Sequence, residues 1–439
     1  MRYALIVAIV LLFPALGLAQ TPTADIKCDG LDSGAVVAPG GKARIDFNVV
    51  AGTGAGTPVD IWLVLSSPFG MFSYDGSGPV AGWWFDLSHV YSTGPLANDS
   101  GTVLDRTIPL GNYTAHIALD DAPNGILNLG NIFVKDAVKF RVALYLNKTL
   151  IPEGEYLMGD HYGIGLPNES PVHAVYIDAF YMEVREVTTL QYCLYLNYAY
   201  ALGEIEVISD EVLKYGDTEV YCKIGTGTSG SRIQWDGSLF SVTPLKENHP
   251  MTYVSWFGAA AYANWRSVQE GLTPCYVPAS WVCLFGNGGY RLPTEAEWEK
   301  ASRGGKSTPY YMFPWGNSVD GSKANYAQSG DPFEGTDPET TPVGYYDGNQ
   351  IPAGADMPNG YGLYDMAGNA IEWCNDWSDL NYYSSSPYNN PRGPASGSIT
   401  RVRRGGACDG GKYTLRCAKR YNLVPELAGF NSGFRLVLE

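Results

Sequence analysis

The segment from Gly289 to Gly305, GYRLPTEAEWEKASRGG, constrains the fold more than any other part of this chain. Thr294 is followed three residues later by Glu297, which is the spacing of a capping box. In a capping box the two side chains accept hydrogen bonds from N–H groups that the first helical turn leaves unpaired. Gly304 tolerates the left-handed conformation found at many helix ends. The segment therefore predicts a short helix that starts after Thr294 and stops near Gly304.

Two further helices are predicted by signals of the same kind. Thr188 has Gln191 three residues further on, which is a second capping box. Ser255 can cap a helix that runs through Gln269, and Gly271 can end it.

The remainder of the C-terminal part has weaker signals. Residues 203–250 are partly rich in Gly and Thr, and we expect a hairpin insertion there. After Gly305 almost nothing has a helical period, so the last third is expected to be irregular, rich in turns and rich in aromatic residues.

The N-terminal part has a different pattern, in which short alternating apolar runs are separated by Gly, Pro, Asn and Asp. With 52 Gly, 28 Pro and 31 Tyr, the composition favours strands and loops over helices. Alternation with such breaks is typical of an antiparallel β-sandwich, which we assign to residues 20–146. The predicted strands are Ala43–Val50, Val59–Leu65, Tyr113–Leu119 and Val138–Leu146.

The C-terminal part resembles a known family. The segments that carry the resemblance are Gly289–Gly305, Asn359–Trp377 (NGYGLYDMAGNAIEWCNDW), Arg401–Gly406 (RVRRGG) and Asn431–Val437 (NSGFRLV). Together they resemble the formylglycine-generating, sulfatase-modifying domain, which is built on a C-type-lectin-like scaffold. The resemblance implies that residues 147–439 form one α+β domain of this kind. The expected fold is thus mostly β, with an N-terminal sandwich followed by a lectin-like domain.

The first residues predict export. Residues 1–19 combine Arg2, the apolar run Leu5–Leu18 and small residues before Gln20, which is typical of a signal peptide. The alternative is a short membrane anchor, but the run is short and contains a proline. No later segment is apolar enough to cross a bilayer. We therefore expect a protein that is secreted, extracellular or at the cell surface, with the periplasm as an alternative.

The charge of the chain limits its partners. The formal net charge is −16, and an acidic surface repels phosphate backbones, so the sequence argues against nucleic acid as a partner. Four sequons, at Asn98, Asn112, Asn147 and Asn168, match the acceptor pattern for N-glycosylation.

The cysteines bear on the activity that the resemblance implies. Formylglycine-generating enzymes hold copper(I) between two Cys thiolates, in a run resembling SWxCHxSYCxRYRxAAR after the RGG turn. Here the corresponding run, ACDGGKYTLRCAKR, is shorter, and Gly410 falls at the first copper position. Cys408 and Cys417 are the remaining weak candidates, nine residues apart. In this alignment both family positions lack Cys, which argues against copper and against catalysis.

Export also permits disulfides. The chain has eight cysteines, which allow 105 pairings, and the sequence does not choose among them. We expect Cys374 and Cys417 to lie near each other and to form one bridge.

The resemblance implies a structural calcium site in the segment DMAGNAIE. Carried over by residue, Asp365 and Glu372 would give carboxylate oxygens, and Gly368 and Ala370 would give backbone carbonyls. Calcium prefers six to eight hard oxygens of this mixed kind. The alternative is that these acids only cap turns and solvate loops.

A second calcium site is also implied by the resemblance. It would begin at Asn325 and at the carbonyl of Tyr326, and its other ligands would come from a loop that is shortened here. Asp331, Glu334 and Asp337 are the candidates for those ligands.

Other conspicuous polar residues are interpreted as structural. The cationic cluster Arg401, Arg403 and Arg404 is expected to pair with acids or to pack on aromatic rings. Arg291 and Arg435 are expected to maintain the fold. His173 and His249 are interpreted as structural hydrogen-bonding residues.

Three functions are compatible with these patterns. The first is an exported, non-catalytic binding or surface protein whose loops, notably Tyr388–Ser398 and Ala407–Tyr413, contact a glycan or a protein. The alternative is a copper-dependent formylglycine-generating oxidase that acts on a sulfatase cysteine. The third is self-assembly into a homo-oligomer or filament, with Gln20–Ile26 as a strand donated to a neighbour.

Overall fold

The computed structural model describes residues 148–439, except 226–229, 308, 335–338 and 396–397, and the backbone of strands between residues 23 and 142. The chain divides into two compact units, Met1–Tyr145 and Leu146–Glu439. Residues 1–19 lie outside the described part, so the signal peptide stays a prediction.

The strands of the first unit pair into two sheets. One has the order β1–β3–β8, and the other has the order β2–β10–β9–β4–β5–β6, with β7 paired to β4. The described pairs are antiparallel except β2 with β10. Their bounds are β1 Thr23–Cys28, β2 Ala35–Val37, β3 Lys42–Val50, β4 Pro58–Ser67, β5 Gly70–Asp75, β6 Gly82–Trp84, β7 Ser92–Pro95, β8 Asp99–Thr107, β9 Gly111–Asp120 and β10 Ile132–Val142.

Three of the predicted strands coincide with β3, β4 and β9, whereas the fourth lies earlier, in β10. The side chains between the two sheets lie outside the described part, so the sandwich packing stays a prediction. Gln20–Ile26, the segment expected to be donated to a neighbour, overlaps β1 from Thr23 onward. β1 is an edge strand that pairs with β3 from Thr23↔Val50 to Cys28↔Ile45, so one side of it is bonded within the unit. Donation of this segment to a neighbour stays a prediction.

The second unit closes with its own C-terminus. β25 (Val437–Leu438) lies between β14 (Phe180–Glu183) and β20 (Tyr290–Arg291) and runs antiparallel to both, while β11 (Lys148–Ile151) pairs with the far side of β14. The first and last strands of the unit therefore share one sheet.

Two other sheets complete the frame of this unit. A hairpin joins β12 (Gly154–Met158) to β13 (His173–Ile177). A four-stranded sheet has the order β23–β22–β21–β24, with β21 at Ile371–Trp377 and β22 at Arg401–Arg404, and with β23 at Tyr421–Leu423 and β24 at Ser432–Gly433. The main apolar core lies among β11–β14, α3 and these strands, with Trp298, Met366 and Val402 fully buried.

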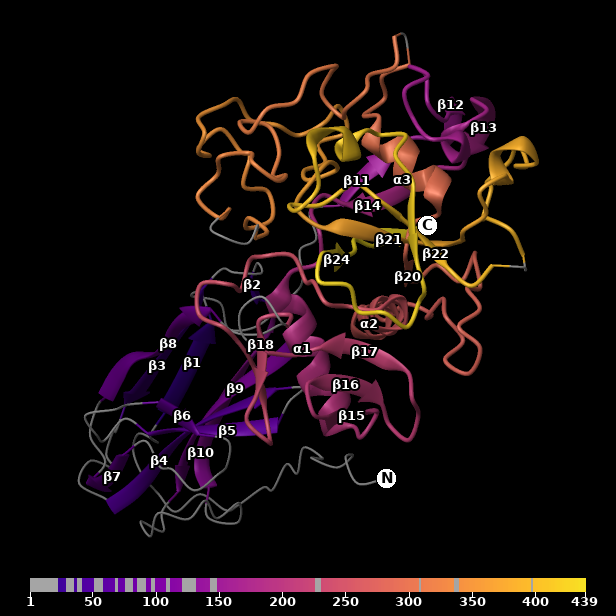
Figure 1. The fold of residues 1–439 in the computed structure, drawn as a ribbon. Coiled ribbons are helices and arrows are strands. Elements are labelled where there is room, and N and C mark those ends of the chain that lie inside the picture. Colours follow the sequence, from indigo (N-terminus) through magenta and orange to yellow (C-terminus); the bar gives the residue numbers. More distant parts are fainter. Residues whose placement is uncertain are drawn as a thin grey trace. The chain divides into compact units, whose positions relative to one another are not determined.

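The helix predictions are confirmed. α1 (Thr189–Ala201), α2 (Trp256–Gln269) and α3 (Glu295–Ser302) begin after Thr188, Ser255 and Thr294, and each of these caps accepts a backbone hydrogen bond. Both predicted capping boxes are formed, and the predicted end residues Gly271 and Gly304 have positive φ. α3 packs against β12, β21 and β22 (Figure 1).

The insertion between α1 and α2 contains more than the predicted hairpin. β15 (Ile205–Ile208), β16 (Glu211–Lys214) and β17 (Val220–Lys223) form a three-stranded antiparallel sheet. A separate hairpin joins β18 (Ile233–Trp235) to β19 (Phe240–Val242). Figure 1 shows β15–β17 beside α1 and α2, which β15 and β17 contact respectively.

After Gly305 the described chain is irregular, as predicted. It contains short strands and the 3-10 turns η4 (Tyr382–Ser384) and η5 (Lys412–Leu415). Among the described residues, no helix has both the length and the apolarity needed to cross a membrane.

Candidate functional site

Ala407–Arg420 is the segment in which the family resemblance predicts the copper positions. It follows β22 through Gly405 and Gly406, both with positive φ. A side chain on Gly406 would meet the carbonyl of Thr414 at 2.8 Å, so this turn packs tightly on η5. The segment is thus a compact loop whose two cysteines are held by their backbone.

Cys408 and Cys417 have different surroundings. The N–H of Cys408 donates to the carbonyl of Asn369 (3.0 Å), whereas that of Cys417 donates to the carbonyl of Met312 (2.9 Å). The Ser302 hydroxyl lies 3.3 Å from the sulfur of Cys417. Burial raises the pKa of Cys408 to about 12 and also raises the pKa of Cys417. Both side chains therefore favour the protonated thiol over the thiolate that binds copper(I).

The predicted bridge between Cys374 and Cys417 is absent. Both residues are buried thiols in the structure. Cys374 lies in β21, where it belongs to the main apolar core. Cys417 instead faces the Ser302 hydroxyl at the end of α3.

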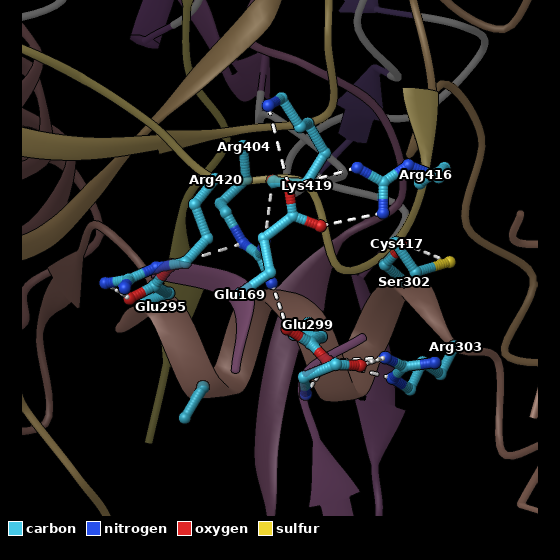
Figure 2. A network of polar contacts seen from close by, with 12 residues as sticks. Glu169, Glu295, Glu299, Ser302, Arg303, Arg404, Arg416, Cys417, Lys419 and Arg420 are labelled. Atoms are coloured by element: carbon cyan, nitrogen blue, oxygen red, sulfur yellow. Dashed lines mark hydrogen bonds and ion pairs between the residues drawn. The ribbon is translucent and has the colours of Figure 1, made fainter. Parts of the chain in front are cut away.

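Buried ion pairs fix the end of the Cys-bearing loop (Figure 2). Arg416 donates to both oxygens of Glu169, at 2.7 and 3.0 Å. Arg420 donates to both oxygens of Glu295 in α3, at 2.7 and 2.8 Å. Each pair joins segments more than 100 residues apart in the sequence. The loop is therefore tied to η2 (Pro167–Glu169) and α3 by paired charges that have little contact with water.

A third buried acid extends this network. One oxygen of Glu299 accepts from Arg303 and from the backbone N–H of Gly159, and the other is bonded to Arg404 (Figure 2). Burial alone would raise the pKa of Glu299, but the positive charges of Arg303 and Arg404 have the larger combined effect and lower it. Both oxygens of Glu299 are thus bonded within the network, and its carboxylate is held in the charged form.

The interpretation of the other arginines as structural is confirmed. The Arg401 guanidinium lies 3.8 Å from the ring centre of Trp256 and 3.6 Å from that of Trp377. Arg435 donates to both oxygens of Glu372 and is fully buried. Arg291 pairs with Glu297 at 2.7 Å, inside the capping box of α3.

The first predicted calcium site is only partly arranged for an ion. Asp365 has φ +56° and one of its oxygens accepts the N–H of Gly344 at 2.6 Å. Both oxygens of Glu372 accept from Arg435, and one also accepts from Trp298, so a cation at Glu372 would compete with a guanidinium. Asp365 and the carbonyls of Gly368 and Ala370 keep the donor chemistry that calcium prefers.

Sequence reasoning missed a further acid beside that segment. Glu186 is buried and accepts from the side chain of Asn369 and from the N–H of Ala370. Burial raises the pKa of Glu186 well above its usual value, and Asp365 adds to the increase.

At the second predicted calcium site, Asp331 and Glu334 both contact Ser329, and the carbonyl of Tyr326 accepts the N–H of that serine. The Asn325 amide donates to the carbonyl of Glu339 at 2.8 Å. Asp337 lies outside the described residues. Within the described part of the chain, no three His, Cys, Asp or Glu side chains are grouped so as to hold a metal. The calcium sites therefore stay predictions.

An aromatic cleft of about 570 Å³ lies between α1, the sheet β15–β17, α2 and residues 274–281. Seven Tyr and Trp side chains line it, namely Tyr195, Tyr198, Tyr215, Tyr221, Trp265, Tyr276 and Trp281. Its size is within the usual range of ligand pockets. The sequence analysis missed this cleft. The one local signal for it is the three-residue spacing of Tyr195 and Tyr198, which places both tyrosines on one face of α1 and so marks part of one wall.

Comparison with known proteins places this scaffold in a family. A model of the "Sulfatase-modifying factor enzyme 1-like domain" matches residues 136–439. The chain therefore belongs to the sulfatase-modifying factor enzyme 1-like domain family.

The proteins similar to this chain are named for different activities. The chain is 33% identical over 300 residues to the formylglycine-generating enzyme of Bos taurus, covering 65% of this chain and 72% of that protein. It is 34% identical over 294 residues to the serine/threonine-protein kinase pkn1 of Chlamydia caviae, covering 66% of this chain and 38% of pkn1. Among solved structures, PvdO from Pseudomonas aeruginosa is 22% identical with a TM-score of 0.46, covering 66% of this chain and 94% of PvdO.

Proposed function

We propose that this chain is an exported, non-catalytic binding protein that uses the family scaffold to contact a glycan or a protein. The observation that carries the proposal is the aromatic cleft of about 570 Å³, because Tyr and Trp give large contact areas at low conformational cost. The exposed side chains of Tyr388 and Tyr413, in the two loops predicted for contact, add to the available surface.

The Cys-bearing loop supports a role without catalysis. Cys408 and Cys417 have different neighbours and raised pKa values, and Gly410 stands at the expected copper position. The polar groups around Cys417 are used in buried ion pairs that stabilise the loop. This arrangement favours a scaffold in which the segment that would bind copper in the family serves to stabilise the fold.

The oxidase is the second candidate, and the similarity to formylglycine-generating enzymes favours it. A direct test is to incubate the full chain, with and without copper(I), with a Cys-containing sulfatase peptide and to measure the aldehyde product. We expect no product above the background of a Cys408→Ser, Cys417→Ser double variant. Copper-dependent turnover that the double variant lacks would replace the binding role with catalysis.

The binding role is tested by presenting the purified chain to arrays of glycans and of extracellular proteins. We expect retention on a defined subset, and loss of retention when Tyr215, an exposed residue of the cleft, is changed to Ser. Tyr162→Ser, at an exposed tyrosine outside the cleft, is the control. If neither variant alters retention, the cleft is not the binding surface.

Export and self-association belong to the same proposal. The net charge of −16 suits a secreted protein that does not bind nucleic acid. N-terminal sequencing of secreted material tests cleavage before Gln20. Light scattering tests whether copies form a homo-oligomer or filament, for which the edge strands of the first unit would be the contact.

Calcium is proposed as a structural ion near Asp365, held by its carboxylate and by the carbonyls of Gly368 and Ala370. Because an ion bound only by the folded state stabilises it, calcium should raise the melting temperature and EDTA should lower it. Asp365→Asn should weaken this response, whereas Asp236→Asn, in an exposed turn, should not. An unchanged melting temperature in EDTA would argue against the ion.

A further inference from the structure

The aromatic cleft between α1, β15–β17 and α2 keeps polar groups that the protein itself does not use. Four tyrosines of its wall have hydroxyls without a hydrogen bond to any described residue, namely Tyr195, Tyr198, Tyr215 and Tyr221. The indole N–H of Trp265, which also lines the cleft, has no acceptor among the described residues. Tyr195 and Tyr221 are only 3% and 5% exposed, and buried polar groups are normally paired. These groups are therefore open to a ligand that both donates and accepts hydrogen bonds.

Other polar groups of the cleft are already bonded within the protein. The Asn264 amide donates to the carbonyl of Tyr276 at 2.7 Å and accepts its N–H at 2.9 Å. The Tyr276 hydroxyl donates to the side chain of Asn375 at 3.0 Å. The Trp281 indole donates to Glu219 at 2.8 Å. A ligand would thus meet phenol hydroxyls and ring faces rather than amides.

The rings of the wall give a ligand apolar faces beside those hydroxyls. The ring centre of Trp265 is 5.7 Å from that of Tyr195 and 6.2 Å from that of Tyr198. The ring centres of Tyr221 and Trp281 are 6.1 Å apart, and their planes meet at 80°. A sugar ring has an apolar C–H face and hydroxyl groups at its edge, each of which both donates and accepts hydrogen bonds. It therefore matches a wall that combines aromatic faces with phenol hydroxyls.

The charge of the cleft selects among sugars. Lys214 lines it, but the Nζ atom lies 3.1 Å from Asp217 and 3.4 Å from Glu219, so these acids already neutralise it. Glu204 lines the cleft as well and is exposed to solvent. Burial raises the pKa of Tyr221, and the charges of Glu219, Glu204 and Asp217 raise it further, so the carboxylates act on the wall itself. An acidic sugar would bring a further negative charge into this field, which argues for an uncharged ligand.

We propose that the cleft binds an uncharged glycan, with one sugar ring packed against the Tyr and Trp side chains and its hydroxyls bonded to the unpaired tyrosine hydroxyls. This inference rests on the proposed binding function and narrows its ligand to one class. An apolar side chain of a protein partner would fill the cleft but leave the buried hydroxyls unpaired, which costs free energy. A sugar pairs them.

The test is titration of the full chain, followed by calorimetry and tryptophan fluorescence, with trisaccharides of glucose, galactose and mannose and with the uronate counterpart of each. We expect at least one neutral trisaccharide to bind about tenfold or more tightly than its uronate counterpart, which carries carboxylates in place of CH₂OH groups. Tyr198→Phe removes one unpaired hydroxyl, keeps the ring and should weaken this binding by about fivefold. Tyr200→Phe is the matched control, because Tyr200 lies in the same helix and does not line the cleft.

The selection by charge is tested separately with Glu204→Gln, which removes one carboxylate and keeps the size of the side chain. The uronate trisaccharides should bind about threefold more tightly to this variant, because one repulsive charge is gone. Glu211→Gln should not change their affinity, since Glu211 lies in β16, pairs with Lys223 at 3.0 Å and does not line the cleft.

Several results would overturn the inference while the binding role stands. They are uronates that bind as tightly as the neutral trisaccharides, a sugar affinity that Tyr198→Phe leaves unchanged, and a uronate affinity that Glu204→Gln leaves unchanged. If no neutral sugar binds but extracellular proteins retain the chain through Tyr215, the ligand is a protein and the inference alone fails. If neither sugars nor proteins bind, the proposed function fails with it. Turnover in the peptide oxidation assay would refute the non-catalytic function without altering the sugar titration.

Discussion

Glu183 shows how one buried acid links stability to pH. It is 3% exposed at the end of β14, where one of its oxygens accepts the N–H of Leu436. Burial raises its pKa from 4.5 to about 7, although Arg266 and Arg435 oppose the increase. The folded state therefore binds a proton that the unfolded chain has released between these two pH values. The free energy of unfolding should fall as pH rises through this window, by up to about 3 kcal/mol.

Glu183→Gln should remove this contribution. The amide can still accept from Leu436, so the variant and the parent should unfold at similar urea concentrations at pH 5. At pH 8 the variant should unfold at a higher urea concentration than the parent. Urea unfolding of both proteins at the two pH values measures the difference, with Glu211→Gln as a surface control. A parallel pH dependence of parent and variant would show that Glu183 titrates normally.

The ion pair between Arg420 and Glu295 is buried, whereas the ion pair between Lys223 and Glu211 is near the surface. Arg420 is 5% exposed and holds both oxygens of Glu295, whereas Lys223 reaches Glu211 at 3.0 Å near the surface. Arg420→Gln removes both of the arginine hydrogen bonds to the buried Glu295 carboxylate, leaves only the more distant Arg404 at 3.7 Å as a cation beside it, and should cost about 3–5 kcal/mol. Lys223→Gln should cost less than about 1 kcal/mol. Denaturant unfolding compares the two, and similar losses would contradict a structural role for the network in Figure 2.

At the scale of elements, helices were predictable because their signals are local. The cap, the capping-box acid and the terminal glycine of α3 all lie between Thr294 and Gly304, and the structure confirms each. The partners of the Cys-bearing loop were not predictable. Arg416 meets Glu169, which is 247 residues earlier, and nothing local marks that pair. The aromatic cleft escaped prediction for the same reason, since its lining comes from α1, an insertion and α2.

The capping box of α3 gives a test at this scale. The Thr294 hydroxyl accepts the N–H of Glu297, and Glu297 accepts the N–H of Thr294 while pairing with Arg291. Thr294→Ala removes one of these bonds at a buried site and should cost about 1–2 kcal/mol. Thr294→Ser keeps the hydroxyl and should recover most of that loss. A serine variant as unstable as the alanine variant would assign the effect to the lost methyl group.

At the scale of the molecule, the second unit has what a separate domain needs. Its core draws on strands from both ends of residues 146–439, and its first and last strands meet in one sheet. We therefore expect a fragment of residues 146–439 to fold alone and to melt cooperatively. This would also test the boundary predicted near residue 147.

Removal of the C-terminal strand β25 provides the matched control for this fragment. β25 pairs with β14 and β20, and Glu439 accepts from Arg291 of β20 at 2.9 Å, so the last residues join two otherwise separate segments. A fragment of residues 146–435 keeps most of the core but loses these contacts, and Val437 leaves the apolar cluster. We expect it to lose the cooperative transition, measured by calorimetry and near-ultraviolet circular dichroism. If both fragments melt alike, the C-terminal strand is an accessory to the fold, and closure must come from the β21–β22 sheet.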